Sequence, residues 1–502
     1  MPDNLFTRFV TAVPDPGRIF LRPLAGAALR YGEVFATAAR FAHVLARHGV
    51  KPGDRVAVQV EKSPAALILY LACLRAGFVY LPLNTGYTPA ELTYFVQDAA
   101  PSLFVCSESG REKIAACLPG TALLTLSDDG QDGSLIRETA GAPDRFADPE
   151  TGMGDLASIL YTSGTTGRSK GAMLTHGNLH SNADSLKRAW EFSADDVLLH
   201  ALPIFHIHGL FVATNVSLLS GATILLLPKF EPDAIFQALP QASVMMGVPT
   251  FYTRLLKDTR LSRDSTHHMR LFISGSAPLL PETHTHWQER TGHAILERYG
   301  MTETNMNTSN PYHGARIPGS VGLPLPGVEI RIADDEGRPL PQGEIGMIEV
   351  RGPNVFKGYW NMPEKTEAEF RRDGFFITGD LGTIGPDGYL RIVGRGKDLI
   401  ITGGLNVYPR EIESLLDDLP GVEESAVVGL PHDDFGEGVT AFLVLKPGAR
   451  LTQEDVAASL SDRLARFKLP KRVLLLDQLP RNTMGKVQKS ALRQEYAGLY
   501  RD

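Results

Sequence analysis

More than any other stretch, residues 161–171 constrain the fold and the function of this chain. They read Tyr-Thr-Ser-Gly-Thr-Thr-Gly-Arg-Ser-Lys-Gly, with three glycines, five serine or threonine hydroxyls and two cations. Glycines let backbone N–H groups approach phosphate oxygens, hydroxyls donate to those oxygens, and Arg168 and Lys170 balance their charge. The stretch predicts a polyphosphate-binding loop. A flexible surface turn stays open as the alternative, because linkers are also rich in Gly, Ser and Thr.

The loop differs from a Walker loop in its spacing and in the residues after it. A Walker loop ends in Gly-Lys-Ser/Thr and leads into a helix. Here Lys170 comes three residues after Gly167 and is followed by Gly171, and residues 172–174 are apolar. We therefore expect the loop to join two strands.

Strands and helices are expected to alternate on both sides of the loop. Residues 56–60, 78–81 and 103–106 predict strands, residues 64–74 predict a helix, and Thr88 to Glu91 form a capping box that opens another helix. Further strands are expected at residues 197–199, 223–227, 244–247 and 271–274. Residues 120–155 are rich in Gly, Asp and Ser and are expected to cross the surface without regular structure. The pattern predicts two α/β layers.

The last third of the chain has a different texture. Residues 319–393 hold short β-branched runs separated by Gly and Pro, which predict a β-rich subdomain. Residues 394–398, Gly-Arg-Gly-Lys-Asp, predict a hinge. The expected fold is α/β, with a large N-terminal domain at residues 1–394 that includes the β-rich subdomain at about 319–394. A small mobile α+β C-terminal domain is expected at residues 395–502.

Composition favours small molecules as partners. The formal charge of −7 over 502 residues gives no electrostatic reason to expect nucleic acid or an anionic membrane. Cys73, Cys106 and Cys117 are too few and too loosely spaced for a disulfide framework or a zinc site. The most apolar run, residues 65–83, contains Arg75, a glycine and a proline, and predicts a buried helix followed by a strand. We expect a cytoplasmic protein.

Four further motifs carry chemistry, and three of them have a structural alternative. Thr302 and Glu303 can serve a phosphate and a Mg²⁺ ion, or cap a helix. Asp380 can grip two ribose hydroxyls, or stabilise a turn. The small residues 274–278 allow a flat purine to approach the backbone. Lys486 can neutralise a carboxylate that attacks a phosphorus atom, or solvate the surface.

Taken together in order, the motifs resemble those of the AMP-forming acyl-CoA synthetase superfamily, which includes nonribosomal adenylation domains and luciferases. The matching segments are residues 161–171, 274–278, 299–304, 378–380, 394–409 and 480–486. The resemblance implies two steps that use ATP, Mg²⁺ and coenzyme A: a carboxylate attacks ATP to give an acyl-adenylate and pyrophosphate, and coenzyme A then displaces AMP after the C-terminal domain rotates. One departure is Ser169, where the family usually has proline.

The resemblance also implies roles for individual residues. The catalytic residues would be Lys486, Thr302 and Glu303, with Glu303 and Thr165 near the metal, Lys397 as the hinge, and Gly403 and Gly404 along the coenzyme A path. The ATP-binding residues would be Thr162, Ser163, Gly164, Thr165, Thr166, Gly167, Lys170, Ser274, Gly275, Ser276, Ala277, Pro278, Tyr299, Gly300, Met301, Asp380 and Arg395.

The acid must be selected by other residues. Arg298 stands where synthetases for fatty or aromatic acids usually carry a small residue, and its planar fork matches a second carboxylate. Arg254 would supply a second cation, and His206 would line the acyl end. This combination resembles malonyl-CoA synthetases, with methylmalonate tolerated. The alternatives are a synthetase for acetate or propionate, or a structural Arg298 paired with Glu297 together with an Arg254 that is a solvated helix residue.

Two other classes of protein remain open. One is a module that loads acyl groups onto a carrier protein, and the other is a nucleotide-binding regulator without catalysis. The complete loop together with Lys486 argues against the regulator. If Lys486 is exposed, a lysine acetyltransferase and a deacetylase acting on it would switch adenylation off and on.

Overall fold

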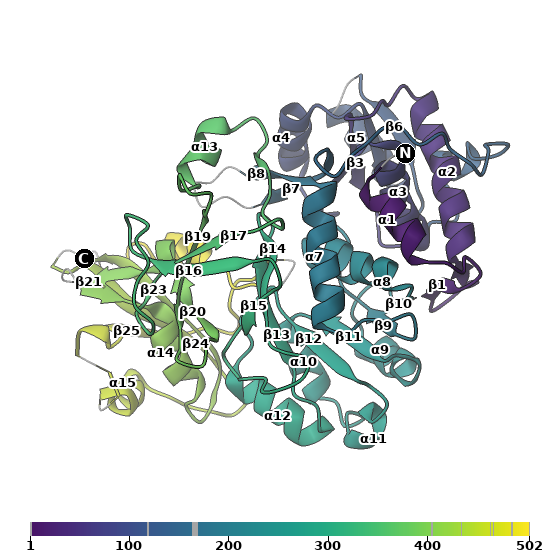
Figure 1. The fold of residues 1–502 in the computed structure, drawn as a ribbon. Coiled ribbons are helices and arrows are strands. Elements are labelled where there is room, and N and C mark those ends of the chain that lie inside the picture. The colour runs from purple at the N-terminus through teal and green to yellow at the C-terminus, as the bar shows by residue number, and fades with distance from the viewer. Residues whose placement is uncertain are drawn as a thin grey trace.

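The structure is a computed structural model that describes residues 3–117, 120–162, 169–402, 405–432, 434–461, 463–464, 466–482 and 485–500. It forms a large N-terminal domain with two large sheets and a smaller sheet, and a smaller C-terminal domain with a sheet of its own (Figure 1). The predicted α/β fold class is confirmed.

A seven-stranded sheet carries the two strands that flank the glycine-rich loop. Its order is β18-β8-β7-β4-β3-β5-β6, with β8 and β18 antiparallel to their neighbours and the rest parallel. The strands are β3 (Arg55–Gln59), β4 (Val79–Pro82), β5 (Leu103–Cys106), β6 (Ala122–Thr125), β7 (Leu156–Thr162), β8 (Lys170–Thr175) and β18 (Gly358–Tyr359). The helices are α3 (Pro64–Ala76), α4 (Pro89–Ala99), α5 (Arg111–Cys117) and α6 (Ser134–Arg137).

Two local predictions in this region have different outcomes. The capping box at the start of α4 is confirmed, because the Thr88 N–H donates to Glu91 Oε2 at 2.8 Å and the Glu91 N–H donates to Thr88 Oγ1 at 3.4 Å. The expectation that residues 120–155 lack regular structure is wrong, because β6 pairs with β5 as the edge strand of the sheet. Flanking glycines and aspartates masked this short apolar run.

A nine-stranded sheet forms the second layer. Its order is β15-β14-β13-β12-β11-β9-β10-β1-β2, and the run from β13 to β1 is parallel. The strands are β1 (Ile19–Pro23), β2 (Leu29–Arg30), β9 (Val197–His200), β10 (Thr223–Leu226), β11 (Val244–Gly247), β12 (Leu271–Ser274), β13 (Leu296–Met301), β14 (Asn305–Ser309) and β15 (Leu323–Pro324). The helices are α1 (Leu5–Ala12), α2 (Tyr31–Arg47), α7 (His176–Ala189), η1 (His208–Thr214), α8 (Asn215–Ser220), α9 (Pro232–Ala238), η2 (Leu239–Gln241), α10 (Pro249–Leu256), α11 (Arg263–Thr266) and α12 (Pro281–Thr291).

The two large sheets share one hydrophobic core. Helix α3 is apolar on every side and almost fully buried, which explains why residues 65–83 are so hydrophobic without spanning a membrane. Leu71 of this helix belongs to the same buried cluster as Leu198 and Ile273 of the nine-stranded sheet. Helix α7 contacts both β8 and β14 and thereby lies between the sheets (Figure 1).

A four-stranded antiparallel sheet follows, as the β-branched runs predicted. Its order is β16-β17-β19-β20, and its members are β16 (Glu329–Ala333), β17 (Gly346–Arg351), β19 (Phe376–Ile384) and β20 (Leu390–Arg395), with α13 (Pro363–Ala368) inserted before β19. Strands β19 and β20 bring Asp380 opposite Arg395. The short helix η3 (Gly396–Asp398) then leads into the last sheet.

The C-terminal sheet lies beside the four-stranded sheet, at the far side of the molecule from α2 (Figure 1). It is built from β21 (Ile400–Thr402), β22 (Leu405–Val407), β23 (Val422–His432), β24 (Gly436–Leu445) and β25 (Arg472–Leu475), with helices α14 (Pro409–Asp417), α15 (Gln453–Ser461), η4 (Arg466–Lys468) and α16 (Lys489–Glu495). One face packs against Ile412 of α14 and the other against Leu492 of α16. None of the helices in the described part of the chain is long and apolar enough to cross a membrane.

Candidate active site

The predicted site residues follow the carboxyl ends of neighbouring parallel strands. Ser274 ends β12, the segment with His206 follows β9, and β13 runs through Arg298 to Met301. Ligands bind in α/β sheets at this edge, because the loops that leave parallel strands there open a crevice. The sheet therefore gathers residues that lie far apart in sequence.

The two ends of the glycine-rich stretch lie side by side. Thr162, the last residue of β7, pairs with Lys170, the first residue of β8, in an antiparallel register, which agrees with the expected strand–loop–strand arrangement. Ser163, Gly164, Thr165, Thr166 and Gly167 lie outside the described residues, as do Gly403 and Gly404. Their predicted roles stay predictions.

Lys170 enters a buried polar network. Its Nζ donates to the Tyr359 hydroxyl at 3.0 Å and to Glu369 Oε1 at 3.2 Å, and it lies 4.1 Å from the centre of the Tyr359 ring. The same hydroxyl is 2.9 Å from Glu303 Oε1 and 2.6 Å from Glu369 Oε2. Tyr359 thus connects the loop to the predicted metal ligand, a link that the sequence did not indicate because no motif marks Tyr359 or Glu369.

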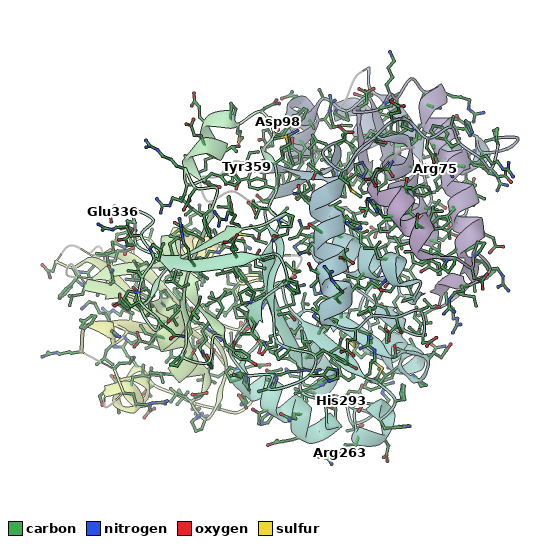
Figure 2. All side chains as sticks on the ribbon, viewed as in Figure 1. Arg75, Asp98, Arg263, His293, Glu336 and Tyr359 are labelled. Carbon is green, nitrogen blue, oxygen red and sulfur yellow. The ribbon has the colours of Figure 1, made fainter. Side chains whose placement is uncertain are left out.

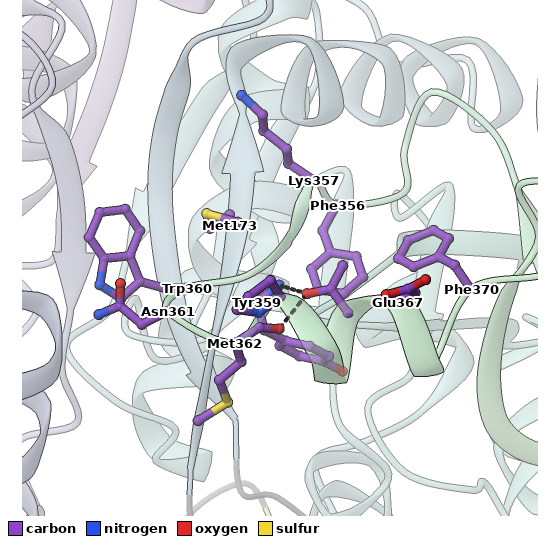
Figure 3. Close-up of a pocket in the computed structure, with 11 residues that line it drawn as sticks. Met173, Phe356, Lys357, Tyr359, Trp360, Asn361, Met362, Glu367 and Phe370 are labelled. Carbon is purple, nitrogen blue, oxygen red and sulfur yellow. Dashed lines mark hydrogen bonds between the residues drawn. The ribbon is translucent and has the colours of Figure 1, made fainter.

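Tyr359 also lines an open cavity of about 710 Å³. Figure 3 shows its mostly apolar lining, which includes Phe356 and Trp360, and the hydrogen bonds that fix it: the Tyr359 N–H donates to Thr366 Oγ1 at 2.9 Å, and this hydroxyl donates to the Met362 carbonyl at 2.9 Å. Trp360 Nε1 donates to the Asp98 carbonyl, so the wall is tied to α4 (Figure 2).

Thr302 and Glu303 lie in a turn between β13 and β14, so no helix begins there and the capping alternative is ruled out. Glu303 is buried, and burial raises the pKa of its carboxyl group. The Glu303 carboxylate has the oxygen donors that Mg²⁺ prefers, and this hard cation would favour the ionised form. The residues present therefore fit the metal that the sequence predicts.

Asp380 joins a second group of predicted site residues. Tyr299 donates its hydroxyl to Asp380 Oδ2 at 2.6 Å, and Arg395 Nε lies 2.7 Å from Asp380 Oδ1. The Asp380 N–H donates to Thr378 Oγ1 at 3.0 Å, and Asp380 lies within strand β19, so the alternative of a turn aspartate does not apply. The three predicted nucleotide residues Tyr299, Asp380 and Arg395 are thus joined through the Asp380 carboxylate.

Residues 274–278 form the small-residue turn that follows β12. Ser276 adopts a left-handed backbone conformation with φ 72°, and its Oγ is 3.2 Å from His208 Nδ1. The Ser274 hydroxyl is buried and makes no hydrogen bond within the described residues. A Cβ at Gly300 would come within 1.9 Å of the Asn305 carbonyl oxygen, so only glycine fits there. Ala277 and Pro278 complete the turn, and Met301 ends β13.

Arg298 is almost fully buried, at 4% exposure, and its Nε and Nη2 atoms have no hydrogen-bond partner among the described residues. Burial lowers its pKa to about 9, so the guanidinium stays charged at neutral pH. The pairing with Glu297 does not occur, because consecutive residues of a strand face opposite sides, and Glu297 is itself buried with Oε1 unpaired within the described chain. Arg298 therefore presents an unpaired cation inside the protein.

Two histidines face Arg298. The pKa of His206 is lowered to about 4 by burial and by the positive charges of Arg298 and Lys486, and the pKa of His208 is lowered by burial, Arg298 and the neighbouring histidines. The His208 N–H donates to His206 Nδ1 at 3.2 Å. His208 was not predicted, although its position two residues after His206 was a signal for it.

Arg254 differs from these buried residues in its exposure to solvent. Its side chain is exposed on α10, and its guanidinium lies over the Phe230 ring at 6.0 Å. The sequence placed Arg254 on a helix next to the site but did not reveal which face of that helix it occupies. The contact of Arg254 with the acid therefore stays a prediction.

Lys486 comes to the site from the C-terminal sheet's side of the molecule. Its side chain remains accessible to solvent, yet surrounding protein and the positive charge of Arg395 lower its pKa, while Asp380 acts in the opposite direction. Gly485, beside it, would place a Cβ 3.3 Å from Thr250 Oγ1 of α10. Lys397 in η3 is exposed, and the next residue, Asp398, accepts a hydrogen bond from Arg493 at 2.7 Å.

Comparison with known proteins places the chain in a family. Residues 10–360 match the AMP-binding enzyme family, and residues 411–486 match the AMP-binding enzyme C-terminal domain. The structure is similar to ATP-bound MatB from Rhodopseudomonas palustris, with 59% identity, a TM-score of 0.98 and full coverage of both chains, and to the apo form of the same protein with a TM-score of 0.86.

Curated relatives agree on the chemistry and differ in the acid. Feruloyl-CoA synthase from Amycolatopsis sp is 38% identical over 94% of each chain, and malonate–CoA ligase from Arabidopsis thaliana is 36% identical over 89% of this chain and 78% of its own. Enzymes of this kind use ATP, Mg²⁺ and coenzyme A, as predicted from the sequence. The chain belongs to the AMP-binding enzyme family, and it is an AMP-forming acyl-CoA synthetase.

Proposed function

We propose that this enzyme is a malonyl-CoA synthetase, which converts malonate, ATP and coenzyme A to malonyl-CoA, AMP and pyrophosphate through malonyl-adenylate, and tolerates methylmalonate. The observation that carries the proposal is the buried guanidinium of Arg298, whose Nε and Nη2 have no hydrogen-bond partner among the described residues. A buried charge without a partner costs several kcal/mol. The second carboxylate of a short diacid would supply the missing partner in a bidentate contact.

The neighbourhood of Arg298 supports a small acid. The guanidinium occupies the space beside Gly275, where a Cβ would come within 2.5 Å of Arg298 Cζ. His206 and His208 carry no charge at neutral pH, since burial and the charge of Arg298 lower their pKa values. A long or aromatic acyl chain would have to displace this charged side chain. The similarity to MatB and to a plant malonate–CoA ligase points the same way.

We assign the nucleotide side of the cleft to the residues named by the family resemblance. Asp380 and Arg395 would hold the ribose, Thr162 and Lys170 the outer phosphates, and Thr302 the α-phosphate. Glu303 would hold Mg²⁺, which when bound neutralises phosphate charge and orients the phosphates for attack. Lys486 would place its ammonium between the attacking carboxylate and the α-phosphate and stabilise the charge that develops there.

We infer that the C-terminal domain sits in the orientation that serves adenylation. The structure is closer to ATP-bound MatB than to its apo form, and Lys486 acts on the pKa of His206 across the cleft. Lys257 of the N-terminal domain and Glu423 of β23 pair at 2.6 Å and support this orientation. A domain boundary at residues 394–395, with Lys397 as the hinge, would let this contact open for the second step.

A panel of acids tests the proposed substrate. In ATP–pyrophosphate exchange, malonate should give the highest kcat/KM, methylmalonate a lower one, and succinate, acetate, propionate and ferulate much lower ones. Formation of malonyl-CoA from free coenzyme A would exclude a carrier-protein loading module. If acetate or propionate gives the highest value, the enzyme is a short monocarboxylate synthetase and the malonate assignment is wrong.

Gly275→Ala should weaken binding of the acid more than binding of the nucleotide. The added Cβ would lie 2.5 Å from Arg298 Cζ and 2.6 Å from its Nε, so the guanidinium must move from its position. We expect kcat/KM for malonate to fall about 10- to 100-fold, because a bidentate contact depends strongly on geometry. Gly154→Ala is the control, since its Cβ would enter open space. Equal losses in the two variants would contradict the placement of the acid beside Gly275.

Asp380→Asn should weaken ATP binding. The change removes the charge that pairs with Arg395 at 2.7 Å and weakens the acceptor for Tyr299. We expect the KM for ATP to rise about 10- to 100-fold at saturating malonate, since hydrogen bonds to charged groups contribute about 1.5–3 kcal/mol. Asp387→Asn, which disrupts the exposed pair with Arg391, is the matched control. An unchanged KM for ATP in Asp380→Asn would remove Asp380 from the ribose site.

A further inference from the structure

Lys62 is a buried lysine with an unusual partner. It lies between the carboxyl end of β3 and the start of α3, is 7% exposed, and its Nζ is 2.8 Å from both Nδ1 and the carbonyl oxygen of His200. Within the described residues it forms no ion pair with a carboxylate. Burial lowers its pKa well below the ordinary value. A lysine held in this way costs stability, so the contact it makes must matter to the fold or to the reaction.

His200 links Lys62 to the carbonyl of Gly209 through a second hydrogen bond. Its Nε2 lies 2.8 Å from the Gly209 oxygen. Because a carbonyl oxygen only accepts hydrogen bonds, the imidazole proton must be on Nε2, and Nδ1 must accept from Lys62. Lys62 therefore fixes the tautomer and the orientation of His200, which ends β9 of the nine-stranded sheet. The contact joins the carboxyl ends of the two large sheets.

Gly209 lies in a segment that folds back on itself. It is the second residue of η1, a π-helix, and a Cβ there would come within 2.1 Å of the Pro203 carbonyl oxygen. Thr214 Oγ1 donates to the same Gly209 carbonyl at 3.0 Å, and the Leu210 N–H donates to the His206 carbonyl at 3.0 Å. π-Helical turns are rare and occur frequently at functional sites. His208 begins this turn and His206 precedes it by two residues, and the charge of Arg298 lowers the pKa of both histidines.

We propose that Lys62 is a positioning residue for the acid-binding side of the cleft. It acts through His200 on the Gly209 carbonyl, and this contact holds His206 and His208 at their distances from Arg298. Lys62 itself touches neither substrate. The inference rests on the proposed location of the acid at Arg298, but it does not depend on which acid is bound.

Lys62→Met tests the proposal, because methionine is of similar length and cannot donate to His200. The KM for the acid should rise about tenfold, which corresponds to the loss of one hydrogen bond to a buried acceptor, while the KM for ATP should change less than about twofold. Equal changes in both KM values, or an unchanged KM for the acid, would overturn the proposal.

A double-mutant cycle tests the route through His200. His200→Phe should raise the KM for the acid by about the same factor as Lys62→Met, and the double variant should be no worse than either single variant. Additive effects, with a rise of about 100-fold in the double variant, would show that Lys62 acts by another route. Thr214→Val removes the second donor to the Gly209 carbonyl and should shift the KM for the acid in the same direction, which keeps the proposal testable if Lys62→Met does not fold.

Tyr31→Phe separates positioning from plain stability. Tyr31 is fully buried, and its hydroxyl donates to the Ala222 carbonyl at 2.7 Å, away from the site residues. This variant should lower Tm and leave both KM values unchanged. A Lys62→Met protein that behaves like Tyr31→Phe would have a purely structural lysine. These readouts use whichever acid gives the highest kcat/KM, so a preference for acetate would refute the malonate assignment without affecting the test of Lys62.

Discussion

Lys486→Ala should reduce acid-dependent ATP–pyrophosphate exchange at least 10²- to 10³-fold, roughly the loss seen when one preorganised donor to a developing charge is removed. Lys486 lies among Arg395, Asp380, Lys397 and Asp398, on the nucleotide side of the cleft. Its contribution should be confined to the first step, so the formation of malonyl-CoA from preformed malonyl-adenylate should persist. The two half-reactions, measured separately, check this.

Lys471→Ala is the control for Lys486→Ala. Lys471 belongs to the same domain, where its Nζ lies 3.6 Å from the centre of the Phe435 ring, and exchange should be unaffected by its loss. Exchange retained in Lys486→Ala would refute the role given to this lysine. Acetylation should have the same effect as the alanine substitution, because it removes the charge. We propose that an acetyltransferase and a deacetylase reach Lys486, whose side chain is accessible.

Arg298→Met should lower kcat/KM for malonate about 10²- to 10³-fold, since a buried charge contact contributes about 2–5 kcal/mol when one partner is truncated. Activity with acetate or propionate should change little or rise, because these acids have no second carboxylate to pair. The Tm of the variant should equal or exceed that of the unchanged enzyme, because the substitution removes a buried cation that lacks a partner in the described structure. Substrate kinetics and thermal unfolding together check both statements.

Arg254→Met is the matched control for Arg298→Met. Arg254 is an exposed arginine that stacks on Phe230, so its loss should leave both selectivity and stability nearly unchanged. A selective loss of malonate activity in Arg254→Met would restore its predicted contact with the acid. An Arg298→Met enzyme that still prefers malonate would show that other residues select the diacid.

The sequence predicted most elements near the loop because their patterns were local. The strand at residues 103–106 and the helix opened by the Thr88 capping box depend on side chains within a few positions of each other. The pairing of β13 with β14, and the order in which β9, β11 and β12 lie side by side, depend on contacts between distant residues and were not predicted. Strand β6 was missed because glycines and aspartates flank its short apolar run.

The site shows the same limit. Arg298 and Lys486 stood out because each occupies a marked position in a short motif. Tyr359 and Glu369 lie in unmarked sequence, and only the fold brings them to Lys170 and Glu303. Arg254 shows a different limit, because a neighbouring position in sequence does not determine which way a helix side chain points, and its contact with the acid stays a prediction.

Strand β13 has a consequence for how such enzymes diversify. Arg298 and Tyr299 are adjacent in the chain, yet Arg298 lowers the pKa of His206 whereas Tyr299 donates to Asp380, so under the proposed function one would serve the acid and the other the nucleotide. A substitution at position 298 would therefore change which acid the enzyme prefers. The proposed ATP-binding residue at position 299 would stay unchanged. We expect laboratory evolution toward new acids to accumulate first on the acyl face of this strand and in residues 203–209.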